Sequence, residues 1–186
     1  MMKENNFGHI MVDIETFGKK SGSAIVSIGA VEFNMLTGET GKEFKINASL
    51  QSCIDIGLTI DPDTVMWWMK QSDEARKSLI EGEVVHINVA LLKLKDFFEQ
   101  CDGKNCEVWG NSPRFDLEKL EAAYEKIATE IPWDFRKERC VRTLVSLYPE
   151  IKNISKFNGV AHDAVFDCLH QIKYCSETYR RIKNLD

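Results

Sequence analysis

Short apolar runs rich in β-branched residues dominate the first third of the chain. They cover residues 10–15, 24–34 and 43–47, and the turn-like sequence L-T-G-E at residues 36–39 separates the second run from the third. Branched side chains pack well on a pleated surface, so such runs are typical of strands. The pattern therefore predicts three strands in an antiparallel meander.

After the meander the apolar residues recur at helical spacing. Positions 89, 91, 92, 94, 97 and 98 are apolar, which predicts a helix over residues 88–100. Asp61 and Pro62 have the residue types of a helix cap and a first helical position, and Ser72 is a second candidate cap. Further helices are expected at 115–128, 140–148 and 164–182, with a short strand at 107–110. This order predicts a mixed-sheet α/β or α+β domain.

Length and composition fit a single soluble domain spanning residues 1–186, with its core at about 9–182. The chain is 44% hydrophobic and 28% charged. No apolar run approaches the ~18 residues that a membrane span needs. Residues 1–8 are polar and lack the apolar segment of a signal peptide, so a cytoplasmic location is expected.

The formal net charge of −5 limits how the chain can meet nucleic acid. It argues against a protein that coats long nucleic acid through a broad basic face. It is compatible with an enzyme that binds a few phosphates through metal ions.

The six cysteines include no C-x-x-C pair. Cys168, His170 and Cys175 are close in sequence, which raises zinc as an alternative. A structural zinc site usually uses two paired ligand sets, and only this loose group is present. Reduced, buried thiols are therefore expected.

Asp13 and Glu15 stand at the end of the first expected strand. Side chains alternate along a strand, so both acids should face one way while Val12 and Ile14 face a buried side. Two carboxylates this close repel each other unless a positive group lies between them, and a hard divalent cation with oxygen ligands is one solution. Taken alone, the pattern is more often a solvated strand face.

Three later residues could complete such a site. Asp116 opens an expected helix after a strand, where an acid is also a common helix cap. His162 precedes the last helix, and Asp167 follows it by five residues, so the pair can converge if His162 lies on the entering loop. A helix N-terminus disfavours the charged imidazole, which suits a neutral base. Each feature alone also fits an ordinary cap or surface histidine.

In combination these motifs resemble a known family. D-I-E-T at residues 13–16, F-D at 115–116 and H-D-A-V-F-D at 162–167 are similar to the three exonuclease motifs of the DnaQ-like superfamily. The H-x-x-x-x-D form is that of its DEDDh subtype. The stretches I-D-P-D-T-V-M-W-W-M-K-Q-S, V-W-G-N-S-P-R-F-D and V-A-H-D-A also resemble a small stand-alone branch. That branch holds bacterial 3′–5′ exoribonucleases and phage or prophage exodeoxyribonucleases.

The resemblance implies an RNase H-like fold, with a mixed five-stranded sheet flanked by helices. It implies a 3′–5′ exonuclease that acts on single-stranded or 3′-overhanging DNA or RNA and releases nucleoside monophosphates by a two-metal-ion mechanism. His162 would be the general base. Two divalent ions, Mg²⁺ or Mn²⁺, would be held by Asp13, Glu15, Asp116 and Asp167.

One position departs from the branch. Related chains tend to carry an aspartate in the segment that reads R-K-E-R-C-V-R-T here, where this chain has Cys140. The acids and the histidine are unaffected. The departure puts in doubt the local network that positions Arg139 and Arg142.

Substrate contacts are expected from aromatic and polar residues near the motifs. Trp67 and Trp68 are adjacent on a helix, so they point about 100° apart, and one is expected in the core while the other is free to stack on a terminal base. Core packing and a solvated basic surface are the alternatives for these residues. The full set of candidates is Phe17, Trp67, Trp68, Asn111, Arg114, Arg139 and Arg142, with Arg136 and Lys137 as further basic residues.

Two other functions remain as alternatives. An RNase H-like endonuclease uses similar acids but does not require the H-x-x-x-x-D spacing. A non-catalytic nucleic-acid-binding module predicts that at least one acid is lost, and all four are present. The choice between DNA and RNA, between single and double strands, and between a monomer and a homodimer stays open.

Overall fold

The structure of the chain is a computed structural model that describes residues 7–185. Residues 1–6 of the polar N-terminal segment considered above therefore lie outside the described part. Over residues 7–185 no helix combines the length and the apolarity needed to cross a membrane.

A mixed six-stranded sheet in the order β4-β3-β2-β1-β5-β6 forms the centre of the molecule. β1 pairs antiparallel with β2, and β2 with β3, which confirms the predicted meander. The other three pairings, β1 with β5, β5 with β6 and β3 with β4, are parallel. The strands are β1 (Gly8–Thr16), β2 (Ile25–Asn34), β3 (Thr40–Ala48), β4 (Val84–Val85), β5 (Glu107–Gly110) and β6 (Glu138–Cys140).

The expected RNase H-like mixed sheet is confirmed, but the expected number of five strands is wrong by one. β4 has two residues and β6 has three, so neither is long enough to leave a periodic pattern. The helix expected over 140–148 is also corrected. Cys140 ends β6, and the helix that follows, α6 (Val141–Val145), is short.

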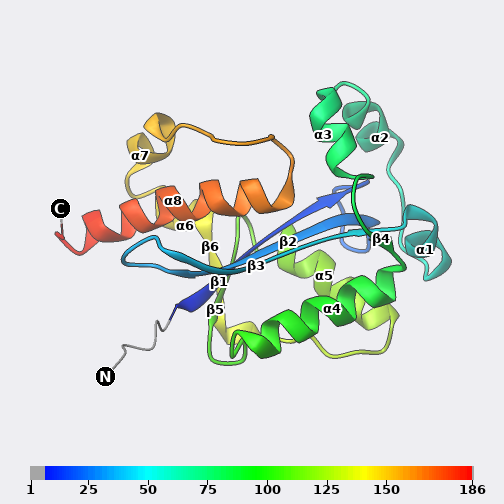
Figure 1. The fold of residues 1–186 in the computed structure, drawn as a ribbon, viewed down its shortest axis with the longest axis horizontal. Helices are drawn as coiled ribbons and strands as arrows, with labels where there is room; N and C mark the ends of the chain where they lie inside the picture. Colours follow the sequence, from blue (N-terminus) through cyan, green and yellow to red (C-terminus); the bar gives the residue numbers. More distant parts are fainter. Residues whose placement is uncertain (1–6, 186) are drawn as a thin grey trace.

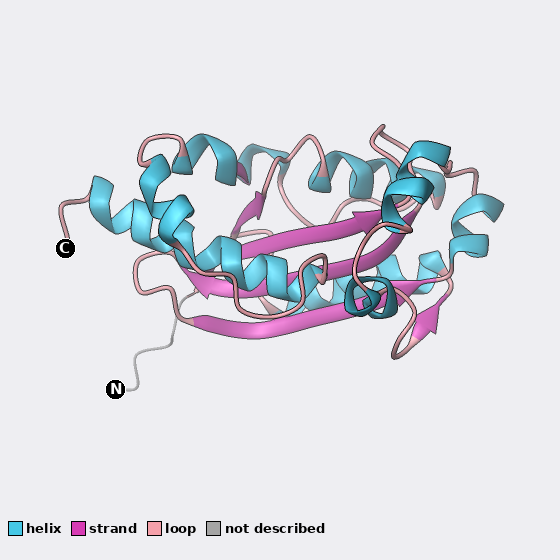
Figure 2. Cartoon of the chain, turned by 90° about the horizontal axis from the view of Figure 1, so that it is seen from above, coloured by secondary structure: helices cyan, strands magenta, loops and turns pink. Residues whose placement is uncertain are grey.

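Helices cover both faces of the sheet (Figures 1 and 2). α4 (Ile87–Gln100) and α5 (Asp116–Lys126) lie on one face, and α8 (Ala164–Ile182) lies along the other, beside α6 and α7 (Pro149–Ile154). Three short helices gather at one end of the sheet, as Figure 1 shows: α1 (Leu50–Asp55), α2 (Pro62–Trp68) and α3 (Asp73–Ser78). A 3₁₀ turn, Phe135–Lys137, precedes β6.

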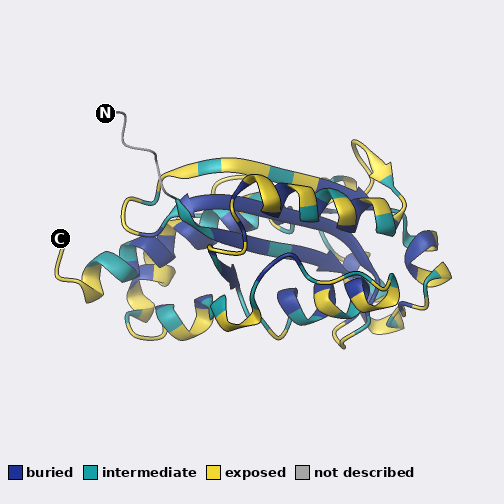
Figure 3. Ribbon diagram, turned by 90° about the horizontal axis from the view of Figure 1, so that it is seen from below, coloured by how far each residue is buried: buried dark blue, intermediate teal, exposed yellow. Residues whose placement is uncertain are grey.

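The sheet divides the apolar interior into two main clusters. Val12 and Ile14 pack with Leu91 and Phe98 on the α4 side, whereas Met11 packs with residues of α8 on the other side. Nine of the ten residues of β2 are buried, which explains its nearly continuous apolar sequence. Figure 3 shows the buried strands beneath the largely exposed outer faces of the helices.

α8 lies very close to β2 at Gly29. A Cβ atom on Gly29 would come within 2.5 Å of the backbone carbon of Ala164, the first residue of α8. Only a glycine allows this approach. The contact fixes the distance between the start of α8 and the sheet.

The cysteines are free thiols, and all but Cys140 are buried. Cys168 lies between α8 and the sheet, with its sulfur 3.6 Å from the carbonyl oxygen of Met11. His170 packs instead against the rings of Phe157 and Tyr174. Cys168, His170 and Cys175 therefore do not form a shared ligand set among the described residues.

Candidate active site

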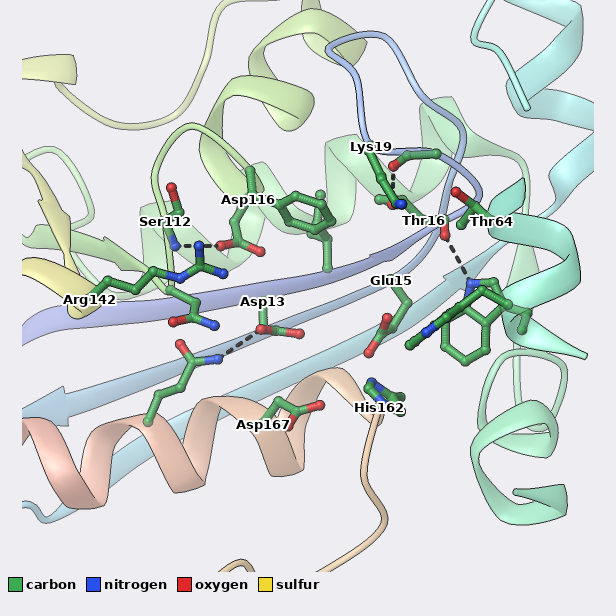
Figure 4. A pocket seen from close by; sticks show the side chains of 17 residues that line it. Asp13, Glu15, Thr16, Lys19, Thr64, Ser112, Asp116, Arg142, His162 and Asp167 are labelled. Carbon is green, nitrogen blue, oxygen red and sulfur yellow. Dashed lines mark hydrogen bonds between the residues drawn. The ribbon is translucent and has the colours of Figure 1, made fainter. Parts of the chain in front are cut away.

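A cavity of about 400 Å³ opens where the end of β1 meets the start of α8. Figure 4 shows carboxylates reaching it from three separate parts of the chain. We call it the acidic pocket. Its lining comprises Asp13, Ile14, Glu15, Thr16, Gly18, Lys19, Thr64, Trp67, Trp68, Asn111, Ser112, Phe115, Asp116, Arg142, His162, Asp167 and Gln171.

Asp13 and Glu15 reach the pocket from β1. Val12 and Ile14 point to the opposite side, where they are buried in the core, so the predicted alternation is confirmed. The side-chain amide of Gln171 on α8 donates a hydrogen bond of 2.8 Å to Oδ1 of Asp13. The rigid central strand thus fixes the spacing of the first two acids.

Asp116 is the first residue of α5, as expected, and it is almost completely buried. The backbone N–H of Ser112 donates to its Oδ2 atom at 3.3 Å. A Cβ on Gly110 would lie 3.0 Å from the same oxygen, so the glycine at the end of β5 lets the carboxylate lie close to the strand. Asp116 is held at the pocket by its own turn.

His162 and Asp167 come from the loop before α8 and from its first turns. His162 has a left-handed backbone conformation with φ of 64°, and Asp163 after it caps the helix. Glu15, His162 and Asp167 each offer one ligand atom, and these atoms lie within 4.8 Å of one another. The predicted convergence of His162 with Asp167 is confirmed.

Two indole rings border the imidazole of His162. The centroid of Trp67 is 5.0 Å from that of His162, and the centroid of Trp68 is 5.8 Å away, both in edge-on geometry. Trp68 is buried and donates from Nε1 to the carbonyl oxygen of Thr16 at 3.0 Å, whereas Trp67 is 43% exposed. One tryptophan is therefore part of the core and the other is open to solvent, as expected.

Burial raises the pKa of every acid in the pocket. The pKa of Asp116 rises to about 7 and that of Asp167 to about 6. The pKa values of Asp13 and Glu15 lie well above their usual range because burial and the neighbouring carboxylates act together. The pocket thus holds more negative groups than its surroundings neutralise.

Burial also lowers the pKa of His162. The sequence had suggested the helix N-terminus as the cause, but the identified cause is removal of the ring from water. The neutral imidazole is favoured, as a base requires.

The remaining substrate-binding candidates separate into two groups. Asn111 and Arg142 line the acidic pocket. Phe17 instead packs against Trp68 and faces a neighbouring apolar hollow. Arg114 is exposed beside Glu118, and Arg139 donates to Glu107 at 2.8 Å.

Phe17, Arg114 and Arg139 do not line the acidic pocket, and their expected contact with substrate stays a prediction. Phe17 follows the last residue of β1 and its ring packs against that of Trp68, whereas Glu107 on β5 provides Arg139 with a carboxylate partner. The additional basic residues are also engaged elsewhere: Arg136 lies near Asp134, and Lys137 donates to the carbonyl oxygen of Asn105.

Several pocket residues were not identified from the sequence, chiefly Gln171, Thr64 and Lys19. Gln171 follows Asp167 by four positions on one helix, which places both on the same face, and this spacing could have revealed it. Thr64 and Lys19 come from a short helix and a turn whose orientation no sequence pattern indicates.

A sequence model of the 3′–5′ exoribonuclease Rv2179c-like domain matches residues 8–179. The chain belongs to this family. It is therefore a 3′–5′ exonuclease, and the resemblance to the DnaQ-like superfamily is confirmed. A comparison with curated proteins finds no significant match.

Solved structures support the fold of this Rv2179c-like domain. The nuclease domain of 3′hExo, a DEDDh family member bound to rAMP, aligns with a TM-score of 0.61 at 11% identity, over 92% of this chain and 91% of that one. Exonuclease I without ligand aligns with a TM-score of 0.63 at 16% identity, over 93% of this chain and 42% of that one. E. coli Exonuclease I in complex with a dA16 oligonucleotide gives 0.59 at 16% identity, over 95% and 42%.

Proposed function

We propose that the chain is a metal-dependent nuclease that hydrolyses the 3′-terminal phosphodiester bond of single-stranded or 3′-overhanging nucleic acid and releases nucleoside monophosphates. The observation that carries this proposal is the convergence of four carboxylates and one imidazole from distant segments in one cavity. The five residues are Asp13, Glu15, Asp116, His162 and Asp167.

The donor set of the pocket suits divalent cations. Carboxylate oxygens are the ligands that Mg²⁺ and Mn²⁺ prefer. Burial and the neighbouring carboxylates raise the pKa values of Asp13 and Glu15, and a bound cation would stabilise their charged forms. Four carboxylates match the charge of two dications, so we propose two ions held by Asp13, Glu15, Asp116 and Asp167.

The ions would provide the electrostatic part of the chemistry. When bound, the two divalent ions would lower the pKa of an attacking water and neutralise charge on the leaving oxygen.

His162 would take the proton of the attacking water. Its lowered pKa keeps the ring neutral near physiological pH. One of its ring nitrogens lies within 4.8 Å of carboxylate oxygens of Glu15 and Asp167, two of the proposed metal ligands. Gln171 would keep Asp13 oriented through its amide hydrogen bond.

Other lining residues are suited to hold the terminal nucleotide. The exposed indole of Trp67 offers a surface on which a base can stack. Arg142 and Asn111 line the same pocket and can meet phosphate or sugar oxygens. The volume of about 400 Å³ lies in the range of ligand-sized pockets.

The family description names exoribonucleases, so RNA is the first substrate to test. The matched solved structures include one with rAMP and one with a dA16 oligonucleotide, so DNA belongs in the same test. The decisive experiment incubates the protein with 3′-labelled single- and double-stranded RNA and DNA, with free or blocked 3′ ends, in Mg²⁺, Mn²⁺ or EDTA.

We expect labelled mononucleotides from free 3′ ends, only when a divalent ion is present. Asp13→Ala should abolish this release, whereas Asp63→Ala, at an exposed acid outside the pocket, should leave it unchanged. Internal fragments in place of mononucleotides, or full activity of Asp13→Ala, would contradict the proposal.

A further inference from the structure

β3 carries none of the pocket acids, yet two of its polar side chains reach toward the loop that holds His162. Lys45 and Asn47 are two residues apart on the strand, so they project from the same face of the sheet. That face is the one covered by α8.

Lys45 is tied to the first turn of α8 through Asp163. Its Nζ atom lies 2.5 Å from Oδ2 of Asp163, whose side chain is only 8% exposed. The other carboxylate oxygen, Oδ1, accepts hydrogen bonds from the backbone N–H groups of Val165 and Phe166, which is the role of a helix cap. One carboxylate thus joins the helix start to β3.

Asn47 supports the other side of the same loop. Its side-chain amide donates to the carbonyl oxygens of Ser78 and Glu81, both at 2.9 Å. The hydroxyl of Ser78, whose nearer acceptor is the carbonyl oxygen of Ala75 at 2.8 Å, also lies 3.3 Å from the carbonyl oxygen of His162. Two series of contacts, one from Lys45 and one from Asn47, therefore connect one face of β3 to the backbone around His162.

His162 requires this support because its backbone is in the left-handed region. A non-glycine residue with φ of 64° is unfavourable, and such a conformation persists only where its surroundings impose it. Gly29 lies opposite Lys45 in the strand register, and Ala164 packs on Gly29. The glycine sets the height of α8 above the sheet, and Lys45 restrains its start.

We propose that Lys45, acting through Asp163, is a positioning residue that sets the imidazole of His162 and the carboxylate of Asp167 in the acidic pocket. This inference rests on the proposed function of that pocket. The backbone N–H of Asp167 donates to the carbonyl oxygen of Asp163 at 2.9 Å, so a shift of Asp163 moves both residues. The charge of Lys45 also offsets that of Asp163, which otherwise adds a fifth carboxylate beside Glu15.

The first test compares Lys45→Met with Lys42→Met. Both lysines lie on β3 and the ammonium group of each makes one hydrogen bond, but Lys42 projects to the opposite face and donates to the carbonyl oxygen of Gln100. Lys45→Met should lower kcat about tenfold with KM within about twofold of the wild type, since a small displacement of reacting groups slows chemistry more than binding. Lys45→Arg should recover most of the loss, and Lys42→Met should match the wild type.

A double-mutant cycle tests whether Lys45 acts through Asp163. Asp163→Asn keeps a good helix cap but removes the charge, so it should fold and lose part of kcat. If Lys45 acts only through Asp163, the kcat of the double variant should be no lower than that of the slower single variant. Multiplied effects, or an unchanged kcat in Lys45→Met, would overturn the proposal.

A measurement without turnover separates this proposal from the proposed function. The imidazole signals of His162 in the NMR spectrum of the metal-free protein are assigned by their loss in His162→Asn. They should shift in Lys45→Met and stay in place in Lys42→Met. If the wild type cleaves no substrate, the proposed function fails, but the His162 signals still test the positioning role. Signals that do not shift in Lys45→Met would reject that role.

Discussion

Gln171 and Asp13 are joined by a hydrogen bond of 2.8 Å between the amide nitrogen of the one and a carboxylate oxygen of the other. The bond connects α8 to β1 inside the acidic pocket (Figure 4). Gln171 is buried and Asp13 is half-buried, and Oε1 of Gln171 has no hydrogen-bond partner among the described residues. A neutral amide thus orients the central acid without cancelling its charge.

Replacing Gln171 by leucine should weaken metal binding about 10- to 100-fold, because groups that orient a ligand contribute this much to affinity. Isothermal titration with Mn²⁺ measures the effect. Gln51→Leu is the matched control, since Gln51 makes the same amide-to-carboxylate bond to Asp55 on an exposed helix. Equal Mn²⁺ affinity in the two variants would show that Asp13 needs no such support.

The raised pKa values of the acids predict how the stability of the metal-free protein depends on pH. The folded state binds more protons than the unfolded state between about pH 4 and the folded values of about 6 for Asp167 and about 7 for Asp116. This contribution to the free energy of unfolding is therefore complete below about pH 4 and is lost as the pH rises through 6 and 7.

Addition of Mg²⁺ or Mn²⁺ should restore stability where the acids are ionised. We expect the melting temperature to rise by several degrees on metal addition at pH 8 and to change little at pH 5. Asp167→Asn, which has no charge to relieve, should show a smaller dependence on both pH and metal. A metal-induced rise that is equal at both pH values would contradict this account.

The lowered pKa of His162 predicts the pH profile of catalysis. With saturating metal, kcat/KM should rise as His162 loses its proton, and the midpoint should lie below pH 6.5 because burial disfavours the charged ring. His162→Asn should flatten this limb and reduce kcat about 10²- to 10⁴-fold. His86→Asn, at an exposed helix cap away from the pocket, should retain both rate and profile.

The two adjacent tryptophans should give opposite results when each is changed to alanine. Trp67→Ala removes an exposed ring and should raise KM for a single-stranded substrate by about 5- to 150-fold, the loss of about 1–3 kcal/mol of stacking. Trp68→Ala removes a buried ring and its bond to Thr16, so it should lower the free energy of unfolding by about 3–5 kcal/mol. Steady-state kinetics and denaturant titration distinguish the two outcomes.

Arg142 and Arg139 provide a similar comparison among the basic residues. Arg142 lines the acidic pocket, whereas Arg139 is paired with Glu107. Arg142→Gln should raise KM several-fold and make binding less sensitive to salt, as expected for a lost phosphate contact. Arg139→Gln should leave KM and the salt sensitivity of binding near their wild-type values. A larger effect of Arg139→Gln would indicate that the substrate passes Arg139.

The parts of the fold that the sequence predicted best have long, uninterrupted patterns. The helix expected over residues 164–182 is α8 with the same limits, because apolar spacing continues through it and Asp163 caps its start. β6 was not predicted, and its last residue, Cys140, was assigned to the following helix, because three residues carry no period and the pairing of β6 with β5 is a tertiary contact.

Of the candidate site, too, the sequence predicted only the features that have a local pattern. Asp13 and Glu15 could be placed from strand alternation, and Asp116 and His162 from their positions before helices. The contacts of Gln171 with Asp13 and of Lys45 with Asp163 join residues 158 and 118 positions apart, and no local pattern encodes them. Phe17 and Arg139, which were predicted to contact substrate, do not line the pocket, because proximity to a motif in the sequence does not fix the direction of a side chain.

The distribution of the pocket acids along the chain has a consequence during synthesis. β1 leaves the ribosome with Asp13 and Glu15 well before His162, Asp167 and α8 emerge. Until then the first two acids have no partners on α8, and the pocket is incomplete. A nascent chain, surrounded by messenger and ribosomal RNA, would thus complete the acidic pocket only after α8 has been synthesised.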